Sequence, residues 1–572
     1  MKRNTFKIFA MLGIIAVALG LNSCSSDYLE TESTSSVDSE LMFESTDNAQ
    51  LALTGMHNLF RDPSSSSYGY GGYQIFMLIS DLLADDVVFT RENAKFTGFA
   101  QLATHRTPTS SDLSYFFFFF YRVGANANNI INNIEQAEGT ASEKAYVKGG
   151  ALVYRAFVYF YLTQCWGSRY IAGADNSQLG VTLNLDNSHD NLPRNTVEEC
   201  YAQINADLDE AISLLESTEE TRSNKSNIDQ YVAKAIKARV LLAQGRWAEA
   251  ASYASDVINN GGFALDADTY SYTKFLETNN RMSDISSTEW IWGKIGRDDQ
   301  DGYLRHYHAF NSNTLASYNK NTPRAILNLL YNKIPASDRR KFIWYPNAGS
   351  VNFSCTYNGK TIKNDPDGVQ PVNQVSTSTS YYRFPYMSNK FLLERLASNR
   401  RVGDVPYIRL PEMYLIKAEC ECRLGNYEQA ASTLYTFVKT RDAEYIQSSA
   451  TGDELLEEIL FQRRIELWGE GFRFFDLKRM NVDLDRGPAP DTEKYPGSDK
   501  AWISKKNLTI ANGYNIDPNA SNYNMCDTKA IGEANRYRSK NSNYWQWLFP
   551  TTETLVNPNC EQNPLGNDGE GS

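Results

Sequence analysis

The chain contains the stretch Ala238-Arg-Val-Leu-Leu-Ala-Gln-Gly-Arg-Trp-Ala-Glu-Ala-Ala251 and repeats its pattern at Ala418-Glu-Cys-Glu-Cys-Arg-Leu-Gly-Asn-Tyr-Glu-Gln-Ala-Ala431. In both stretches an apolar helical run ends at a glycine, an aromatic residue follows two positions later, and a pair of alanines comes next. Glycine ends helices because it adopts the left-handed conformation at no steric cost. The aromatic residue then packs back on the first helix, and the alanines let a second helix approach closely. The pattern therefore predicts two hairpins of antiparallel helices.

Helical hairpins of this kind are the units of tetratricopeptide (TPR) repeats, which bury their apolar faces by stacking on one another. Elsewhere, apolar residues at helical spacing predict helices over about residues 49–60, 116–137 and 142–165. Thr196 and Glu199 form the sequence of a capping box, and an apolar stripe follows as far as Leu215. These features predict a mainly α fold built on a TPR-like scaffold of helical hairpins.

Changes of character along the chain predict five segments. They are a lipoprotein signal peptide (1–23), a flexible tether (24–38), an N-terminal TPR-like helical part (39–260), a loop-rich ligand-binding insertion (261–405), and C-terminal TPR-like helices with a tail (406–572). The insertion has short β-like runs such as residues 289–293 among loops rich in Asn, Ser, Asp and Gly. We expect the tail, from residue 481 onwards, to pack back over the insertion.

The N-terminal residues have the organisation of a secretory signal peptide. Basic residues at positions 2, 3 and 7 precede an apolar run over residues 8–21, which is shorter than the roughly 20 apolar residues that span a bilayer. The sequence Leu21-Asn22-Ser23-Cys24 that follows resembles a bacterial lipobox. This resemblance implies cleavage before Cys24 and attachment of lipid to its thiol. The alternative is an ordinary signal peptide beside an incidental cysteine.

The composition bears on the class of partner. The formal net charge is −12, and loss of the three basic residues of the signal peptide takes it to −15. The chain therefore lacks the excess of basic residues that is typical of nucleic-acid binding. Aromatic residues make up 13% of the chain, more than a helical core needs, and we expect many of them on loops and surfaces. Cys420 and Cys422 point away from each other on a predicted helix, and the other cysteines lack the spacing of a disulfide framework.

Several motifs occur in order along most of the chain. They are residues 151–162 with Trp166-Gly167, the hairpin at 238–251, the helix at 407–419, the stretch 464–479, and the tail motifs Leu548-Phe549-Pro550 and Gln562-Asn563-Pro564. Together they resemble the motifs of the SusD/RagB family of surface glycan-binding lipoproteins. Thr551 and Thr552 depart from the family, which usually has Ile-Pro there. A set of mixed charges within 464–479, namely Arg464, Glu466, Glu470, Arg473 and Asp476, is predicted to form structural ion pairs between helices.

The resemblance implies a lipid-anchored protein of the outer membrane that faces the cell exterior. It further implies binding of oligosaccharide or polysaccharide, delivery to a partner TonB-dependent (SusC-like) transporter, and no enzymatic activity. Two alternatives stay open at this point. One is capture of peptide for a similar transporter, and the other is a pure TPR interaction scaffold whose aromatic residues only pack.

Aromatic residues on loops are the candidate ligand contacts, because a neutral sugar offers C–H faces that stack on flat rings. Two segments combine aromatic residues with glycine or polar neighbours, and a third is a weaker candidate. The residues are Tyr68, Tyr70 and Tyr73 after the first helix, Tyr303, Tyr307 and His308 in the insertion, and Trp344. The resemblance implies an aromatic arc from the first two segments. Ordinary loop packing is the alternative for each.

Other polar clusters give weaker signals of chemistry. His306 and His308 have no third metal ligand at suitable spacing, and we expect no cofactor, although a structural calcium ion in an acidic loop is left open. Asp81, Asp85 and Asp86 are too close on one predicted helix to flank a glycosidic bond. We therefore expect no catalytic residues.

Overall fold

The computed structural model describes most of the predicted scaffold. The described residues are 41–60, 70–89, 95–188, 190–270, 282–297, 306–311, 324–344, 354–357, 360–363, 388, 390–391, 403–486 and 537–566. The signal peptide and the tether, with Cys24, lie outside them. No helix among the described residues is both long enough and apolar enough to cross a membrane.

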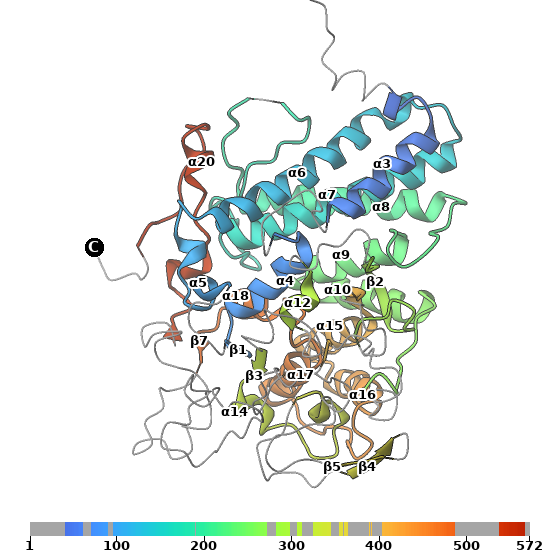
Figure 1. The fold of residues 1–572 in the computed structure, drawn as a ribbon, viewed down its shortest axis with the longest axis vertical. Coiled ribbons are helices and arrows are strands. Elements are labelled where there is room, and N and C mark those ends of the chain that lie inside the picture. Colours follow the sequence, from blue (N-terminus) through green and yellow to red (C-terminus); the bar gives the residue numbers. More distant parts are fainter. Residues whose placement is uncertain are drawn as a thin grey trace, which may run out of the picture.

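The described residues are mainly helical, as predicted (Figure 1). The N-terminal part contains α3 (Thr46–Leu59), α4 (Tyr73–Leu82), α5 (Thr97–Ala100), η2 (Thr104–Arg106), α6 (Ser111–Asn133), η3 (Ile134–Gln136), α7 (Ala141–Trp166), α8 (Val197–Ser217), α9 (Gln230–Gln244) and α10 (Trp247–Asn260). The remainder contains α12 (Tyr307–Asn311), α14 (Asn328–Tyr331), η5 (Arg339–Ile343), α15 (Leu410–Arg423), α16 (Tyr427–Val438), α17 (Gly452–Glu466), α18 (Arg473–Met480), η10 (Asn543–Trp545) and α20 (Thr551–Thr554).

The two repeated stretches form the predicted helical hairpins. Gly245 and Gly425 adopt left-handed conformations, with φ of 75° and 82°, at the turns between α9 and α10 and between α15 and α16. Helix α10 packs on α15, so the two hairpins stack on each other. The guanidinium of Arg423 lies 4.8 Å from the ring centroid of Trp247, which joins the second hairpin to the first. The predicted capping box of Thr196 and Glu199 also forms, at the start of α8.

The strands occur in two-stranded antiparallel pairs. These are β1 (Val87–Phe89) with β3 (Arg324–Ile326), β2 (Trp290–Lys294) with β6 (Val405–Arg409), β4 (Ser354–Tyr357) with β5 (Lys360–Lys363), and β7 (Leu484–Asp485) with β8 (Tyr537–Arg538). The β-like run predicted at residues 289–293 is therefore a strand. Every residue of β2 is buried, and its partner β6 leads directly into α15, so this pair fixes the insertion to the helical scaffold.

The described part of the C-terminal tail packs on the N-terminal helices, so the expectation that it covers the insertion is wrong for these residues (Figure 1). The backbone N–H of Trp547 donates to the carbonyl of Cys165 at 2.8 Å, and that of Leu548 donates to the carbonyl of His105 at 3.0 Å. The Asn563 amide donates to the carbonyl of Trp166 at 2.7 Å. Carbonyl groups left free at the end of α7 thus find partners in the tail.

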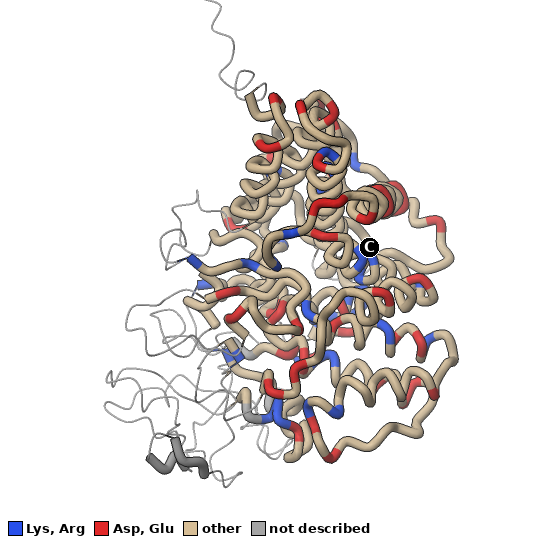
Figure 2. The backbone as a smooth tube through the Cα atoms, turned by 90° about the vertical axis from the view of Figure 1, so that its right-hand side faces the viewer, with Lys and Arg blue, Asp and Glu red and all other residues tan. Residues whose placement is uncertain are grey.

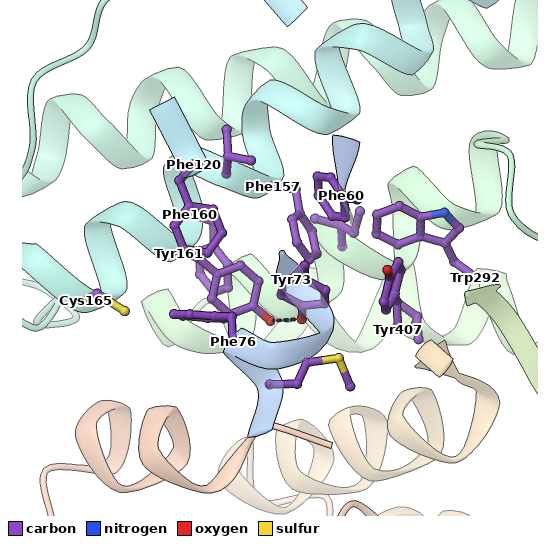
Figure 3. Close-up of a cluster of buried hydrophobic side chains, with 14 of the residues drawn as sticks. Phe60, Tyr73, Phe76, Phe120, Phe157, Phe160, Tyr161, Cys165, Trp292 and Tyr407 are labelled. Carbon is purple, nitrogen blue, oxygen red and sulfur yellow. Dashed lines mark hydrogen bonds between the residues drawn. The ribbon is translucent and has the colours of Figure 1, made fainter. Parts of the chain in front are cut away.

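Among the described residues, aromatic side chains concentrate in the core, whereas we expected many of them on loops and surfaces. Figure 3 shows Phe60, Tyr73, Phe157, Trp292 and Tyr407 gathered from five elements or loops. Rings of this cluster pack edge to face, as between Tyr73 and Tyr407 at 5.0 Å between centroids. Such pairs add to the hydrophobic gain of burial. The high aromatic content therefore serves long-range packing between segments that are distant in the sequence.

The mixed charges of residues 464–479 form ion pairs, as predicted, and they extend into a buried network that we call the Glu466 network. Its members are Arg340, Lys390, Arg409 and Arg441 with Glu289, Asp338, Glu466 and Glu470. Arg409 bonds Glu466 at 2.9 Å and Glu470 at 2.5 Å. Burial alone would raise the pKa of Glu466, but the surrounding guanidinium groups hold that pKa well below its usual range.

Charges on the surface are mixed, and the described cysteines are unpaired. Figure 2 shows acidic and basic positions interspersed along the helices in view. Cys165, Cys200, Cys420, Cys422 and Cys560 are buried free thiols, which confirms that Cys420 and Cys422 do not form a disulfide with each other.

We predict that Glu466→Gln lowers the free energy of unfolding by about 3–5 kcal/mol, because it leaves buried guanidinium groups without their shared carboxylate. Glu249→Gln is the matched control. Its partner pair, Arg246–Glu249, has side chains 40% and 52% exposed, so its loss should cost less than about 1 kcal/mol. Chemical denaturation followed by tryptophan fluorescence measures both variants. Equal effects of the two substitutions would contradict a structural role for the Glu466 network.

Candidate functional site

Most of the predicted ligand-contacting side chains that the structure describes are part of the core. Tyr73, Tyr307, His308 and Trp344 are at most 2% exposed. A buried ring presents no face on which a sugar can stack, so the prediction is wrong for these four residues. Tyr68 and Tyr303 lie outside the described residues.

The buried candidates have specific internal partners. The Tyr73 hydroxyl donates to the Tyr161 hydroxyl at 3.0 Å, a contact drawn in Figure 3. The Tyr307 hydroxyl donates to the carbonyl of Gly469. The Trp344 ring lies edge to face with that of Trp468, with centroids 5.7 Å apart. Each candidate thus joins its own segment to a distant helix or turn.

Tyr70 is the one predicted contact that the structure describes outside the core. Its half-buried ring stacks on that of Tyr115 at 4.2 Å with an interplanar angle of 7°. Lys95 lies 5.2 Å from the centroid of Tyr70 and pairs with Asp112 at 3.2 Å. Burial is the main cause that raises the pKa of Tyr70. This aromatic stack, flanked by one cation and one carboxylate at the start of α6, offers a partly accessible ring edge to a ligand.

His306 and His308 belong to a buried hydrogen-bonded chain. The Lys294 ammonium lies 3.1 Å from His306 Nε2, the two imidazole Nδ1 atoms are 3.1 Å apart, and His308 Nε2 lies 2.8 Å from the Ser283 hydroxyl. Across the described ranges, no group of three His, Cys, Asp or Glu residues is arranged to hold a metal ion. The chain connects β2 to the short helix α12.

Asp81, Asp85 and Asp86 all have bonding partners within the fold. Asp85 bonds Arg473 at 2.7 Å, and Asp86 bonds Arg464 at 2.5 Å. Asp81 accepts a hydrogen bond from the backbone N–H of Gly471 at 2.8 Å. Burial raises the pKa of Asp81 to about 8. These contacts hold the end of α4 against α17 and the start of α18.

A polar cleft of 510 Å³, which we call the α3 cleft, opens beside α3. It is lined by α3, the start of α7, the loop 220–227 and the segment after β2. The lining residues are Thr46, Asp47, Gln50, Thr54, His57, Asn58, Glu143, Tyr146, Val147, Glu220, Thr221, Ser223, Asn224, Ser226, Asn227, Lys294, Ile295 and Arg297. Its size falls within the range of roughly 300–1,000 Å³ that is usual for ligand sites.

The loop 220–227 is held in place by contacts on the side away from the α3 cleft. Arg222 pairs with Asp229 at 2.8 Å and donates to the carbonyl of Ile291 in β2 at 2.8 Å. The Asn224 amide oxygen accepts from the backbone N–H of Ser226 at 2.8 Å. Because the loop is anchored to a buried strand, its amides and hydroxyls have defined positions before any ligand arrives.

One face of α3 supplies the opposite wall. Gln50, Thr54 and Asn58 are spaced four residues apart and therefore share that face. Within the described residues, the side-chain amides of Gln50 and Asn58 have no hydrogen-bond partner. Each amide supplies both donors and an acceptor. The cleft is thus suited to a ligand that carries many hydroxyl or amide groups.

Sequence reasoning missed the α3 cleft because its residues come from four separate segments. Two signals were present. The polar stretch Thr221-Arg-Ser-Asn-Lys-Ser-Asn227 and the polar stripe on the first helix both mark polar surface. Neither pattern shows that the two surfaces face each other.

Comparison with known proteins places the chain among helical envelope proteins and identifies the family. A family model described as "SusD family" matches residues 274–565, just over half of the chain. The protein therefore belongs to the SusD family. A second model, described as "Starch-binding associating with outer membrane", matches residues 27–242.

Individual relatives agree with this assignment. A SusD-like protein of Bacteroides ovatus is 27% identical over 396 residues, which are 63% of this chain and 64% of that relative. SusD-like protein P38 of Formosa agariphila is 24% identical over 506 residues, 84% of this chain and 93% of the relative.

Solved structures share the fold. A SusD-like carbohydrate binding protein from Bacteroides vulgatus superimposes with a TM-score of 0.65 at 23% identity, covering 91% of this chain and 98% of that one. A SusD superfamily protein from Bacteroides thetaiotaomicron gives a TM-score of 0.64 at 20% identity, covering 91% and 100%. At these identities the likeness concerns the fold.

We predict that Asp81→Asn removes a pH dependence of stability. The ordinary Asp pKa is 3.8 and the folded-state pKa is about 8, so the folded protein holds a proton that the unfolded chain releases. The stabilisation is complete below the ordinary pKa and is lost as pH rises through about 8. Melting temperatures between about pH 5 and about pH 9 should therefore fall more for the native protein than for Asp81→Asn.

Asp190→Asn makes the same substitution at an exposed position and serves as the control. Its profile should follow that of the native protein. If Asp81→Asn also follows the native profile, Asp81 is not a protonated carboxyl in the folded state.

Proposed function

We propose that this protein is a lipid-anchored, surface-exposed protein of the outer membrane that binds oligosaccharide and passes it to a TonB-dependent, SusC-like transporter. The observation that carries the proposal is the α3 cleft, with its amide and hydroxyl lining. A sugar unit presents hydroxyl groups that both donate and accept hydrogen bonds. Side chains such as Gln50, Asn58 and Asn224 match this requirement.

The chemistry of the cleft favours binding over catalysis. The Glu143 carboxylate accepts hydrogen bonds from the Thr140 backbone N–H and from the Thr46 hydroxyl, both at 2.8 Å. It therefore stabilises the start of α7. The paired aspartates at the end of α4 are likewise committed to arginine and backbone partners. This distribution supports a non-enzymatic binding protein.

Names of similar proteins support the same ligand class. One structural neighbour is called a carbohydrate binding protein, and one matching family model is described by starch binding and association with the outer membrane. Tyr70, together with Tyr68 and Tyr303, is proposed as a further set of ligand contacts. The lipid on Cys24 would keep the binding body beside its transporter.

We predict that the double variant Gln50→Ala/Asn58→Ala weakens glycan binding about thirtyfold, because each of the two lost hydrogen bonds costs on the order of 1 kcal/mol. Residues 25–572 are first screened on a glycan array. An oligosaccharide that the array retains is then titrated into the same protein by calorimetry. The exposed Gln429→Ala on α16 is the control and should bind as the native protein does.

Unchanged affinity in the double variant would show that the oligosaccharide binds outside the α3 cleft. Absence of any glycan ligand for the native protein would overturn the proposed function. Retention of peptides in a parallel peptide screen would then favour the peptide-capturing alternative.

We predict that Cys24→Ala leaves glycan affinity unchanged and abolishes surface display, because attachment depends on the acylated thiol. Surface labelling of intact cells, compared with total protein by immunoblot, measures the effect. Ser23→Ala keeps the cysteine and serves as the control. Full surface labelling of Cys24→Ala would contradict the lipid anchor.

A further inference from the structure

A second, smaller cleft has an unusual balance of charge. This cleft of 190 Å³, which we call the α18 cleft, lies where the end of α18 meets the turn after α7 and the tail. Its lining residues are Ser168, Arg169, Leu477, Lys478, Asn481, Val482, Lys540, Asn541, Ser542, Asn543, Trp545 and Gln546. Three of them are cations and none is acidic.

The deepest of the three cations is Lys478. Its residue is 3% exposed, and its ammonium donates to the carbonyls of Gln164 at 2.6 Å and Gly167 at 2.9 Å. Carbonyl oxygens orient the ammonium but do not neutralise it. Burial lowers the pKa of Lys478 to about 7, as expected for a cation that has lost water without gaining a counter-ion.

The two outer cations also lack carboxylate partners. Arg169 donates to the carbonyl of Tyr170 at 3.4 Å, and the Lys540 side chain is exposed. Within the described ranges, no carboxylate forms an ion pair with Arg169, Lys478 or Lys540. The nearby Asp483 carboxylate accepts instead from the Lys540 backbone N–H at 2.7 Å and from the Tyr537 hydroxyl at 2.8 Å.

Elsewhere in the protein, the buried cations of the Glu466 network are paired. Arg340 bonds Asp338 at 2.6 Å, and Lys390 bonds Glu470 at 2.6 Å. In a chain with a net charge of −12, three cations that converge on one cleft without a carboxylate form a local positive site. Such a site attracts an anion, because attraction to the anion offsets part of the free energy needed to desolvate the cations.

We propose that the α18 cleft binds an anionic substituent, a sulfate ester or a carboxylate, on the glycan that this protein captures. The inference rests on the proposed function and adds a ligand class to it. The Arg169 guanidinium suits the paired oxygens of either group. Asn481, Asn541 and Asn543 line the same cleft and supply amide donors for the remaining oxygens.

The test compares ligands that share a backbone and differ in charge. Dextran sulfate, neutral dextran and sodium sulfate are titrated into residues 25–572, with polygalacturonate as the carboxylate probe. The variants are Arg169→Gln/Lys540→Gln and, as a control with the same change of net charge, Lys333→Gln/Lys439→Gln at exposed positions. Melting temperatures check that both double variants fold as the native protein does.

The expected result is that at least one anionic polymer binds about tenfold more tightly than neutral dextran, and that Arg169→Gln/Lys540→Gln loses this preference. The control variant should retain it, and added salt should weaken it. Equal losses in both double variants would overturn the proposal, because the effect would then come from net charge. Tight binding of sodium sulfate without binding of either polymer would also overturn it, in favour of a free-ion site.

The outcomes separate this proposal from the proposed function. A native protein that binds neutral oligosaccharides from the array but does not prefer the anionic polymers keeps the proposed function and refutes the α18 cleft as an anion site. A native protein that binds neither neutral nor anionic glycans refutes the proposed function itself.

Discussion

The Glu466 network is the constraint on which the described fold depends. Glu466 lies at the end of α17 and receives Arg409 from the end of β6, Arg441 from the turn after α16, and Arg340 from η5. Among the described residues, four cations face four carboxylates in this network, so burial leaves no net charge. Removal of one partner would leave an uncompensated buried charge. The network therefore fixes the insertion to the C-terminal helices in one arrangement.

Because the Glu466 network occupies buried charged groups, ligand-binding groups are expected outside the core. Charged residues such as Glu466, Arg473 and Asp85 form ion pairs between elements. The polar groups that remain available lie at the margins of the scaffold. They line the α3 cleft, where loops meet the first helix, and the α18 cleft, where the tail meets α18. A rigid interior with polar margins suits a protein that binds a ligand without transforming it.

The two clefts differ in the chemistry of their linings. The α3 cleft offers donors and acceptors for hydroxyl groups, whereas the α18 cleft offers positive charge. Hydrogen bonds to neutral groups contribute modestly each, while charge adds discrimination between ligands that share a backbone. Tyr70, stacked on Tyr115 beside Lys95, is a third, partly exposed feature.

The sequence by itself determined the features that depend on neighbours within a few positions. The left-handed glycines at 245 and 425, the capping box at Thr196, the β-like run before residue 294 and the family motifs were all predictable, because turns and caps involve short-range contacts. Only the tertiary structure decided that Tyr73 and Tyr307 are buried and that Gln50 faces the loop at 221–227. Burial and cleft formation depend on segments hundreds of positions apart, and no local pattern records which of them meet.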